Sequence, residues 1–171
     1  SGTETTFALM DAIATLEGRP HACRAALMPS GLAAISTALL AFTRPGDHVL
    51  MSDSVYGPAR VFATTMLARF GVRTTFFDPC LPVEGPEGLA GCLEDATRVI
   101  YLESPGSYTF EVQDVPAICA LARERGILTM LDNTYASPVL ARPFDWGVDL
   151  SVVALTKYWA GHSDVLMGAV V

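Results

Sequence analysis

Short apolar segments recur along the chain, and most of them are continuous rather than alternating with polar residues. Continuous apolar segments are typical of strands that are covered on both faces of a mainly parallel sheet. We predict six strands, at residues 48–52, 74–78, 98–104, 127–132, 150–156 and 168–171. Amphipathic stretches between them predict helices over 33–41, 59–70 and 115–125. This alternation predicts an α/β fold with three layers, in which helices cover both faces of a mainly parallel sheet.

One domain is predicted over residues 1–171, because no linker, repeat or low-complexity segment interrupts the pattern. Val171 ends inside an apolar segment, and Ser1 and Gly2 open abruptly on polar residues. We therefore expect the chain to be truncated at both ends, with a smaller C-terminal domain absent.

The composition narrows the functional class. Hydrophobic residues make up 51% of the chain and charged residues 17%, as in a globular protein. The formal net charge is −7, and no cluster of Lys and Arg offers a surface for nucleic acid. No apolar stretch is long enough to cross a bilayer, and Ser1 opens no signal-peptide pattern. We predict a cytoplasmic protein that binds neither nucleic acid nor membrane.

The candidate metal ligands and disulfide partners are scattered. They are Cys23, Cys80, Cys92, Cys119, His21, His48 and His162. No two cysteines have the spacing of a metal-binding pair, and the histidines form no cluster with them. We predict no metal site and no disulfide, with all four cysteines as buried or partly buried reduced thiols.

The strongest local signal is a predicted strand that ends in Thr156 and Lys157. Ligands of open α/β sheets gather beyond the carboxyl ends of the strands, which is where Lys157 would lie. A partly buried lysine loses its proton more readily than a free one and can condense with an aldehyde. The alternative for Lys157 taken alone is a solvated side chain at the end of a strand.

Asp132 ends the preceding predicted strand and would lie at the same edge of the sheet. Pyridoxal phosphate (PLP) works as an electron sink when its ring nitrogen is kept protonated, and a buried aspartate beside that nitrogen does this. An ordinary Asx-turn or helix cap is the alternative for Asp132 alone.

Two further segments offer contacts to such a cofactor. Ser30, Gly31 and Leu32 precede or begin a predicted helix, where a hydroxyl, backbone amides and the helix dipole can bind a phosphate. Thr156 can add a hydroxyl to the same phosphate, and Tyr56 can stack on the ring from the loop after the first strand. A plain helix cap at Ser30 and a tyrosine wedged against a helix are the alternatives.

With these residues in this order, the chain resembles the Cys/Met-metabolism family of PLP enzymes, and the match runs nearly end to end. Its most specific segments are 45–50, 55–57, 103–105, 132–134, 156–158 and 161–164. The resemblance implies the aminotransferase-like (type I) fold, in which residues 1–171 are the PLP-binding large domain. It also implies a homotetramer, built as a dimer of dimers, whose active sites are shared between two subunits.

Within the family, the segments 103–107 and 111–116 look most like those of bacterial cystathionine β-lyase. The resemblance implies that Lys157 holds PLP as a Schiff base, is displaced by the amino group of L-cystathionine and then takes the Cα proton. Homocysteine leaves from Cβ, and pyruvate and ammonia follow, as a step of methionine biosynthesis. Tyr56 would assist proton transfer, and Thr134 would contact the cofactor ring from behind Asp132.

The chain departs from the family pattern in two respects. Many relatives carry a phosphate-binding serine three residues before the lysine, where this chain has Ala154. The family's Tyr-x-Arg segment, which reaches the neighbouring subunit's phosphate site, and the Arg that binds the substrate carboxylate lie outside residues 1–171. A γ-synthase or methionine γ-lyase is the alternative within the family. A nucleotide-binding or non-catalytic α/β module is the alternative from another class, although no G-x-G-x-x-G or P-loop supports it.

Overall fold

The computed structural model describes residues 2–19 and 21–171. Its core is one seven-stranded sheet with the order β1-β7-β6-β5-β4-β2-β3. The strands are β1 (Ala26–Met28), β2 (His48–Ser52), β3 (Arg73–Phe77), β4 (Thr97–Glu103), β5 (Leu128–Asp132), β6 (Leu150–Val153) and β7 (Gly168–Val170). The α-helices are α1 (Glu4–Gly18), α2 (Gly31–Phe42), α3 (Gly57–Phe62), α4 (Val115–Glu124) and α5 (Ser137–Leu140).

The sheet is mainly parallel, as predicted. β3, β2, β4, β5 and β6 run parallel to one another, so their carboxyl ends meet at one edge. β7 is antiparallel to both of its neighbours, β6 and β1. The sequence analysis did not predict β1 or α1, because β1 has only three residues and α1 has a weak contrast between its faces.

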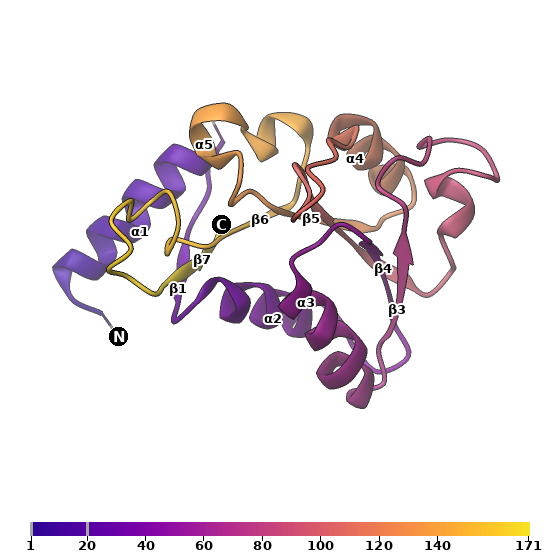
Figure 1. Cartoon of the computed structure of the whole chain (residues 1–171), viewed down its shortest axis with the longest axis horizontal. Helices are drawn as coiled ribbons and strands as arrows, with labels where there is room; N and C mark the ends of the chain where they lie inside the picture. Colours follow the sequence, from indigo (N-terminus) through magenta and orange to yellow (C-terminus); the bar gives the residue numbers. More distant parts are fainter. Residues whose placement is uncertain (1, 20) are drawn as a thin grey trace.

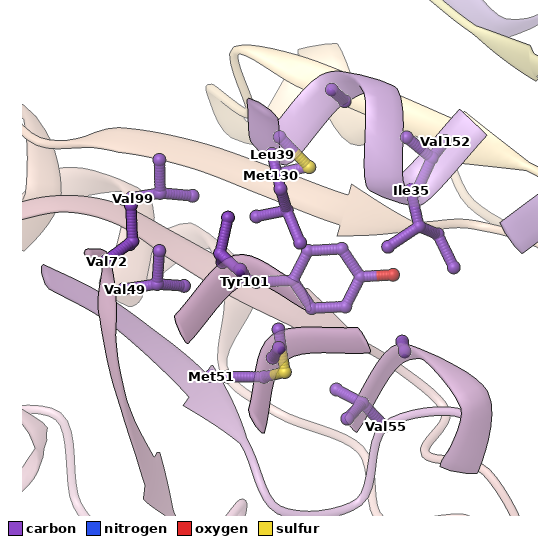
Figure 2. Packing of buried hydrophobic residues seen from close by; sticks show 14 residues of the cluster. Ile35, Leu39, Val49, Met51, Val55, Val72, Val99, Tyr101, Met130 and Val152 are labelled. Carbon is purple, nitrogen blue, oxygen red and sulfur yellow. The ribbon is translucent and has the colours of Figure 1, made fainter. Parts of the chain in front are cut away.

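Helices cover both faces of the sheet, which confirms the predicted three layers: α2 and α3 lie on one face, and α1, α4 and α5 on the other (Figure 1). Alternate residues of a strand point to opposite faces. Val49 and Met51 of β2 therefore pack with α2 and α3, whereas Leu50 packs with α4. Figure 2 shows Tyr101 of β4 at the centre of the first of these two clusters.

Capping residues fix where the main helices begin. Ser30 accepts a hydrogen bond from the Ala33 amide at 3.0 Å, and Asp114 accepts one from the Ala117 amide at 3.1 Å. Such caps satisfy amides that have no partner inside the helix. Pro116 lies in the first turn of α4, where a missing amide proton removes no helical hydrogen bond. The capping at Ser30 fixes the start of α2 at the sheet edge where β4, β5 and β6 end.

Three predicted elements differ from the structure. β6 ends at Val153 rather than at residue 156, and turn residues follow it, so Lys157 lies in a turn instead of directly after a strand. β3 is an edge strand whose residues alternate in burial, because only one neighbour covers it. The helix predicted over 59–70 begins at Gly57 and continues from α3 into a π-helical turn, η1 (Ala63–Leu67).

The described residues also form two short 3-10 helices, η2 (Leu89–Cys92) and η3 (Pro143–Trp146).

All four cysteines are free thiols, but Cys80 is exposed, which corrects the prediction that every cysteine is at least partly buried. Within residues 2–19 and 21–171, no group of three metal-ligating side chains comes together. None of the helices described is both long and apolar enough to span a membrane.

Candidate functional site

A pocket of about 850 Å³ lies at the carboxyl edge of the parallel strands, between the ends of β4, β5 and β6 and the starts of α2 and α3. All eight residues that the sequence analysis selected line it: Ser30, Gly31, Leu32, Tyr56, Asp132, Thr134, Thr156 and Lys157. Parallel strands bring these segments together because each strand delivers its last residues to the same edge. The spatial convergence that the candidate site requires is therefore present.

Asp132 is the buried carboxyl of this pocket, with 6% of its surface exposed. The Thr134 amide donates to its Oδ1 at 3.0 Å, which is the Asx-turn that the alternative interpretation predicts. The buried Tyr101 hydroxyl lies 3.5 Å from Oδ2, as a donor. Burial raises the pKa of Asp132, and the donors from Thr134 and Tyr101 oppose that rise. Asp132 can form this turn and still serve the pocket, because the turn engages only its Oδ1.

Glu103 is a second buried carboxyl in the same pocket, and the sequence analysis missed it as a site residue. It ends β4 and pairs in register with Asp132 of β5. The Tyr56 amide donates to its Oε2 at 2.6 Å. Burial and the Asp132 carboxyl raise the pKa of Glu103 to about 8. A glutamate at the end of a predicted buried strand, next to a strand that ends in aspartate, was the signal that could have identified it.

The start of α2 forms one wall of the pocket. The Ser30 cap engages the Ala33 amide through its hydroxyl and the Ala34 amide through its carbonyl. Within the described residues no hydrogen bond engages the Gly31 and Leu32 amides, so the first two helical amides remain available to an anion. Ser30 is thus a helix cap, as its alternative interpretation has it, and a pocket residue as well.

Glycines permit this wall to approach the sheet. A Cβ on Gly31 would lie 2.7 Å from the Ala154 Cβ, and a Cβ on Gly168 would lie 2.2 Å from the Ser30 carbonyl oxygen. Side chains at these two positions would push the start of α2 away from β6 and β7. Gly168 was another residue that the sequence analysis did not select. Ala154 is small enough to fit beneath Gly31, which gives a packing reason for its size.

The turn after β6 carries Thr156 and Lys157. Lys157 is exposed in this chain, which corrects the expectation of partial burial. The Thr156 hydroxyl donates to the Met167 carbonyl at 3.1 Å and accepts from the Met167 amide at 3.0 Å, so its proton is engaged there. The Thr134 hydroxyl accepts from the Ala154 amide at 2.8 Å and ties this turn to the end of β5. Thr134 therefore links Asp132 to the segment that leads to Lys157.

Aromatic side chains form the outer part of the pocket. Tyr56 is 40% exposed and stands directly before α3, and its backbone is held by Glu103. Tyr108, Tyr135 and Tyr158 line the pocket as well, and none of them was selected from the sequence. Tyr135 also packs edge to face against Phe110, with ring centroids 5.3 Å apart. These rings give the pocket flat apolar surfaces that can contact a planar cofactor.

A separate polar cluster lies on the opposite face of the sheet. Glu17 of α1 is fully buried, and it accepts hydrogen bonds from the Asn133 side chain at 3.0 Å and from the Ser151 hydroxyl at 3.0 Å. Burial raises the pKa of Glu17 to about 7. The cluster joins α1 to β5 and β6 directly behind Asp132. Neither Glu17 nor this network was predicted from the sequence.

The pocket fits PLP in its chemistry. Asp132 offers a buried carboxyl for a ring nitrogen, the start of α2 offers amides and a hydroxyl for a phosphate, and Lys157 offers an amine for an aldehyde. The close approach of Gly31 and Gly168 to their neighbours keeps the amide wall free of side chains. These three kinds of group are what a phosphorylated pyridine aldehyde requires.

Comparison with known proteins agrees with this chemistry. The chain is 44% identical over 168 residues to cystathionine beta-lyase MetC of Bacillus subtilis and 42% identical over 172 residues to MetC of Escherichia coli. These alignments cover 98% and 99% of the chain, but 41% and 42% of the two relatives. An L-alanine/L-glutamate racemase of Wolbachia pipientis is 40% identical, covering 99% of the chain and 40% of that protein. The chain therefore spans about two fifths of the length of the curated relatives it matches.

A solved structure shows the same fold and a related cofactor. It is an O-acetylhomoserine (thiol)-lyase, MetY, of Campylobacter jejuni, and it contains N'-pyridoxyl-lysine-5'-monophosphate. The TM-score is 0.88 at 30% sequence identity, over 98% of this chain and 40% of that one. The model of the family described as Cys/Met metabolism PLP-dependent enzymes matches residues 1–171. The chain belongs to this family of PLP-dependent enzymes of cysteine and methionine metabolism.

Proposed function

We propose that the protein containing this chain cleaves L-cystathionine by PLP-dependent β-elimination, giving homocysteine, pyruvate and ammonia. One observation carries the proposal: Lys157, Asp132 and the start of α2 line the same pocket. The identity to relatives that are named cystathionine beta-lyase supports the choice of reaction. We further propose a role in methionine biosynthesis, where homocysteine is the useful product.

Each pocket wall has a part in holding PLP. Lys157 would bind its aldehyde carbon, and Asp132 would hold a proton on its ring nitrogen. Ser30 and the amides of Gly31 and Leu32 would bind the phosphate. Thr156 would join them only by releasing Met167, so we assign it the smaller share of that binding. Tyr56 would stack on the ring, and Thr134 would keep the Asp132 carboxyl oriented through its amide.

When bound, PLP supplies an electron sink for the charge that develops at the substrate Cα. The chain's own residues then handle the protons. The Lys157 amine takes the Cα proton as general base and returns a proton to the sulfur that leaves Cβ. Tyr56, half-exposed at the pocket, assists this transfer. The exposure of Lys157 in a turn leaves its amine free to reach both atoms.

Related activities are the alternatives to this proposal. A γ-synthase or methionine γ-lyase would use the same pocket residues, and one relative is a racemase. The segments 103–107 and 111–116 favour β-elimination, since they look most like those of β-lyases. All of these activities begin with removal of the Cα proton, so the products have to distinguish them.

The proposal includes a cytoplasmic homotetramer, a dimer of dimers, whose active sites are shared between subunits. Large apolar side chains of the pocket lining are exposed, among them Tyr108, Tyr158 and Leu166. Such exposure supports a covering surface from another part of the protein. The residues that bind the substrate carboxylate would come from outside residues 1–171.

Spectroscopy and product analysis of the full-length protein test the proposal. We expect a visible absorbance band with PLP that borohydride bleaches, and its loss in Lys157→Ala. Incubation with L-cystathionine should release pyruvate in excess over 2-oxobutyrate. A preparation that stays colourless with added PLP contradicts the cofactor assignment. Dominant 2-oxobutyrate would assign γ-cleavage, and alanine racemisation without pyruvate would assign the racemase activity.

A further inference from the structure

Glu103 is a buried pocket group that the proposed reaction does not use. Only 3% of its surface is exposed, and it lines the pocket between the ends of β4 and β5. Its Oε2 accepts the Tyr56 amide at 2.6 Å. No Lys or Arg within the described residues forms an ion pair with it. A buried carboxyl without a cation has to be accounted for.

The β4 and β5 register places Glu103 beside Asp132, on the face of the sheet that α2 and α3 cover. Two carboxyls that share a buried site cannot both ionise without a large cost, so one of them keeps a proton. Asp132 has the better support for a negative charge, because the Thr134 amide and the Tyr101 hydroxyl both donate to it, whereas Glu103 accepts from the Tyr56 amide. A protonated ring nitrogen next to Asp132 would favour its charge further.

We propose that Glu103 is a positioning residue of the proposed reaction: as the uncharged member of the carboxyl pair, it leaves the negative charge on Asp132 and holds the Tyr56 backbone at the pocket. This inference rests on the proposed function. Glu103 acts through two residues that would touch the cofactor, one on its ring nitrogen and one on its ring face. The raised pKa of Glu103, about 8, agrees with an uncharged side chain at neutral pH.

The other titratable groups around Glu103 do not remove this proton. Burial and the two carboxyls raise the pKa of Tyr101 well above its usual value, so its hydroxyl stays a donor. The remaining titratable groups of the pocket are Tyr56, Tyr108, Tyr135, Tyr158 and Lys157. Lys157 is exposed, and within the described residues it forms no ion pair with Glu103 or Asp132.

Substitutions separate an uncharged role from a charged one. Glu103→Gln keeps the size and the acceptor for Tyr56 without a charge, so PLP affinity should stay within about threefold of the unmodified protein. Glu103→Ala leaves the Tyr56 amide unpaired and should weaken PLP binding about tenfold. Glu103→Asp withdraws the carboxyl from Tyr56 and should resemble Glu103→Ala. Exposed Glu87→Gln is the matched control and should change nothing.

The measurements are PLP titration of the full-length apoprotein, followed by absorbance, and denaturant unfolding of the apoprotein between pH 5 and 9. If Glu103 holds a proton in the folded state and releases it on unfolding, the folding equilibrium constant falls tenfold for each unit by which the pH rises between about 4.5 and 8. Glu103→Gln should remove that part of the pH dependence, and Glu87→Gln should retain it.

Three results overturn the inference. If Glu103→Gln binds PLP as weakly as Glu103→Ala, or leaves the pH dependence of unfolding unchanged, Glu103 is not the uncharged member of the pair. If Glu103→Ala binds PLP like the unmodified protein, Glu103 positions nothing. Failure of the proposed function gives a different result, because the unmodified protein then binds no PLP. The pH dependence of unfolding still shows in that case whether Glu103 carries a proton in the folded state.

Discussion

Two buried glutamates lie near the end of β5, on opposite faces of the sheet. Glu103 lies on the face that α2 and α3 cover, beside Asp132 and within the pocket. Glu17 lies on the face that α1 covers, where Asn133 and Ser151 hydrogen-bond it. Asp132 and Asn133 are consecutive residues, so a single step along the strand passes from one environment to the other.

The two environments differ in the hydrogen-bond donors that surround the buried carboxyls. Glu17 accepts hydrogen bonds from the Asn133 amide and the Ser151 hydroxyl, and these bonds connect α1 to the sheet. The Glu103 and Asp132 pair lies at the pocket wall, where it has too few donors for two charges. A buried carboxyl with a raised pKa therefore serves in two ways in this protein. Glu17 links α1 to the sheet, whereas the Glu103 and Asp132 pair can bind a cation at the pocket.

The largest effects are expected from substitutions of the neighbouring residues Asp132 and Asn133. Asp132→Asn should lower kcat/KM for L-cystathionine about 1000-fold, because a neutral amide does not hold a proton on the ring nitrogen. The free energy of unfolding of the apoprotein should fall by less than about 1 kcal/mol, since a buried charge is removed at the same time. Steady-state kinetics and denaturant unfolding check both parts. Asn133→Ala should instead lower the free energy of unfolding strongly and kcat/KM little. Equal effects of the two variants would contradict the distinction between the two faces of the sheet.

Removing the glutamate on the α1 face should affect stability instead. Glu17→Ala leaves the Ser151 hydroxyl buried without an acceptor and leaves the Asn133 amide only the Ala141 carbonyl, so the free energy of unfolding should fall by about 3 kcal/mol. Glu17→Gln should recover part of this, because an amide oxygen can accept one of the two bonds. Chemical denaturation of the full-length apoprotein measures the loss. A large change in kcat of the folded Glu17→Gln variant would place Glu17 in the chemistry after all.

The pH dependence of stability tests the environment of Glu17. The pKa of Glu17 rises from 4.5 to about 7 on folding, so protonation favours the folded state. Its contribution is fully present below pH 4.5 and is lost as the pH rises to about 7, at about 1.4 kcal/mol per pH unit. Unfolding of Glu17→Gln between pH 4 and 8 should lack this slope. An unchanged slope would show that Glu17 is ionised in the folded protein.

The smallest effect concerns the pocket wall alone. Gly168→Ala should weaken PLP binding about tenfold, because its Cβ would collide with the Ser30 carbonyl and displace the start of α2. Gly57→Ala is a suitable control, since nothing lies within 4 Å of a Cβ added there. Titration of the two apoproteins with PLP compares them. Equal affinities would mean that α2 shifts without cost.

Much of the fold was predictable, because long apolar strands and amphipathic helices have distinct periods. The strands around Leu50, Ile100 and Leu131 are buried on both faces, and their continuous apolar sequence reports this directly. β1 is too short, and the faces of α1 differ too little, for their periods to be recognised, and distant parts of the chain provide their contacts. Glu17, for example, looks like any helix-surface glutamate until Asn133, 116 residues later, meets it.

The pocket residues were predictable to the extent that strand ends mark them. Asp132 and Lys157 follow buried apolar segments, and parallel strands deliver such residues to one edge. Glu103 carried the same signal but was treated as part of a family motif only. Gly168 could not have been selected, since its importance comes from the close approach of the Ser30 carbonyl to the place that a Cβ would take, which no local pattern encodes.

The turn that follows β6 has a consequence for turnover. Lys157 donates its amide to the Ala154 carbonyl and accepts the Gly161 amide, so its backbone is anchored at both sides. Its side chain, however, extends from a bend rather than from the pleated ladder, and no sheet hydrogen bond depends on where it points. If Lys157 carries PLP as proposed, its amine would leave and regain the cofactor in every cycle while the surrounding main chain stays still. This motion would need only side-chain rotation, which takes place on the picosecond-to-nanosecond scale.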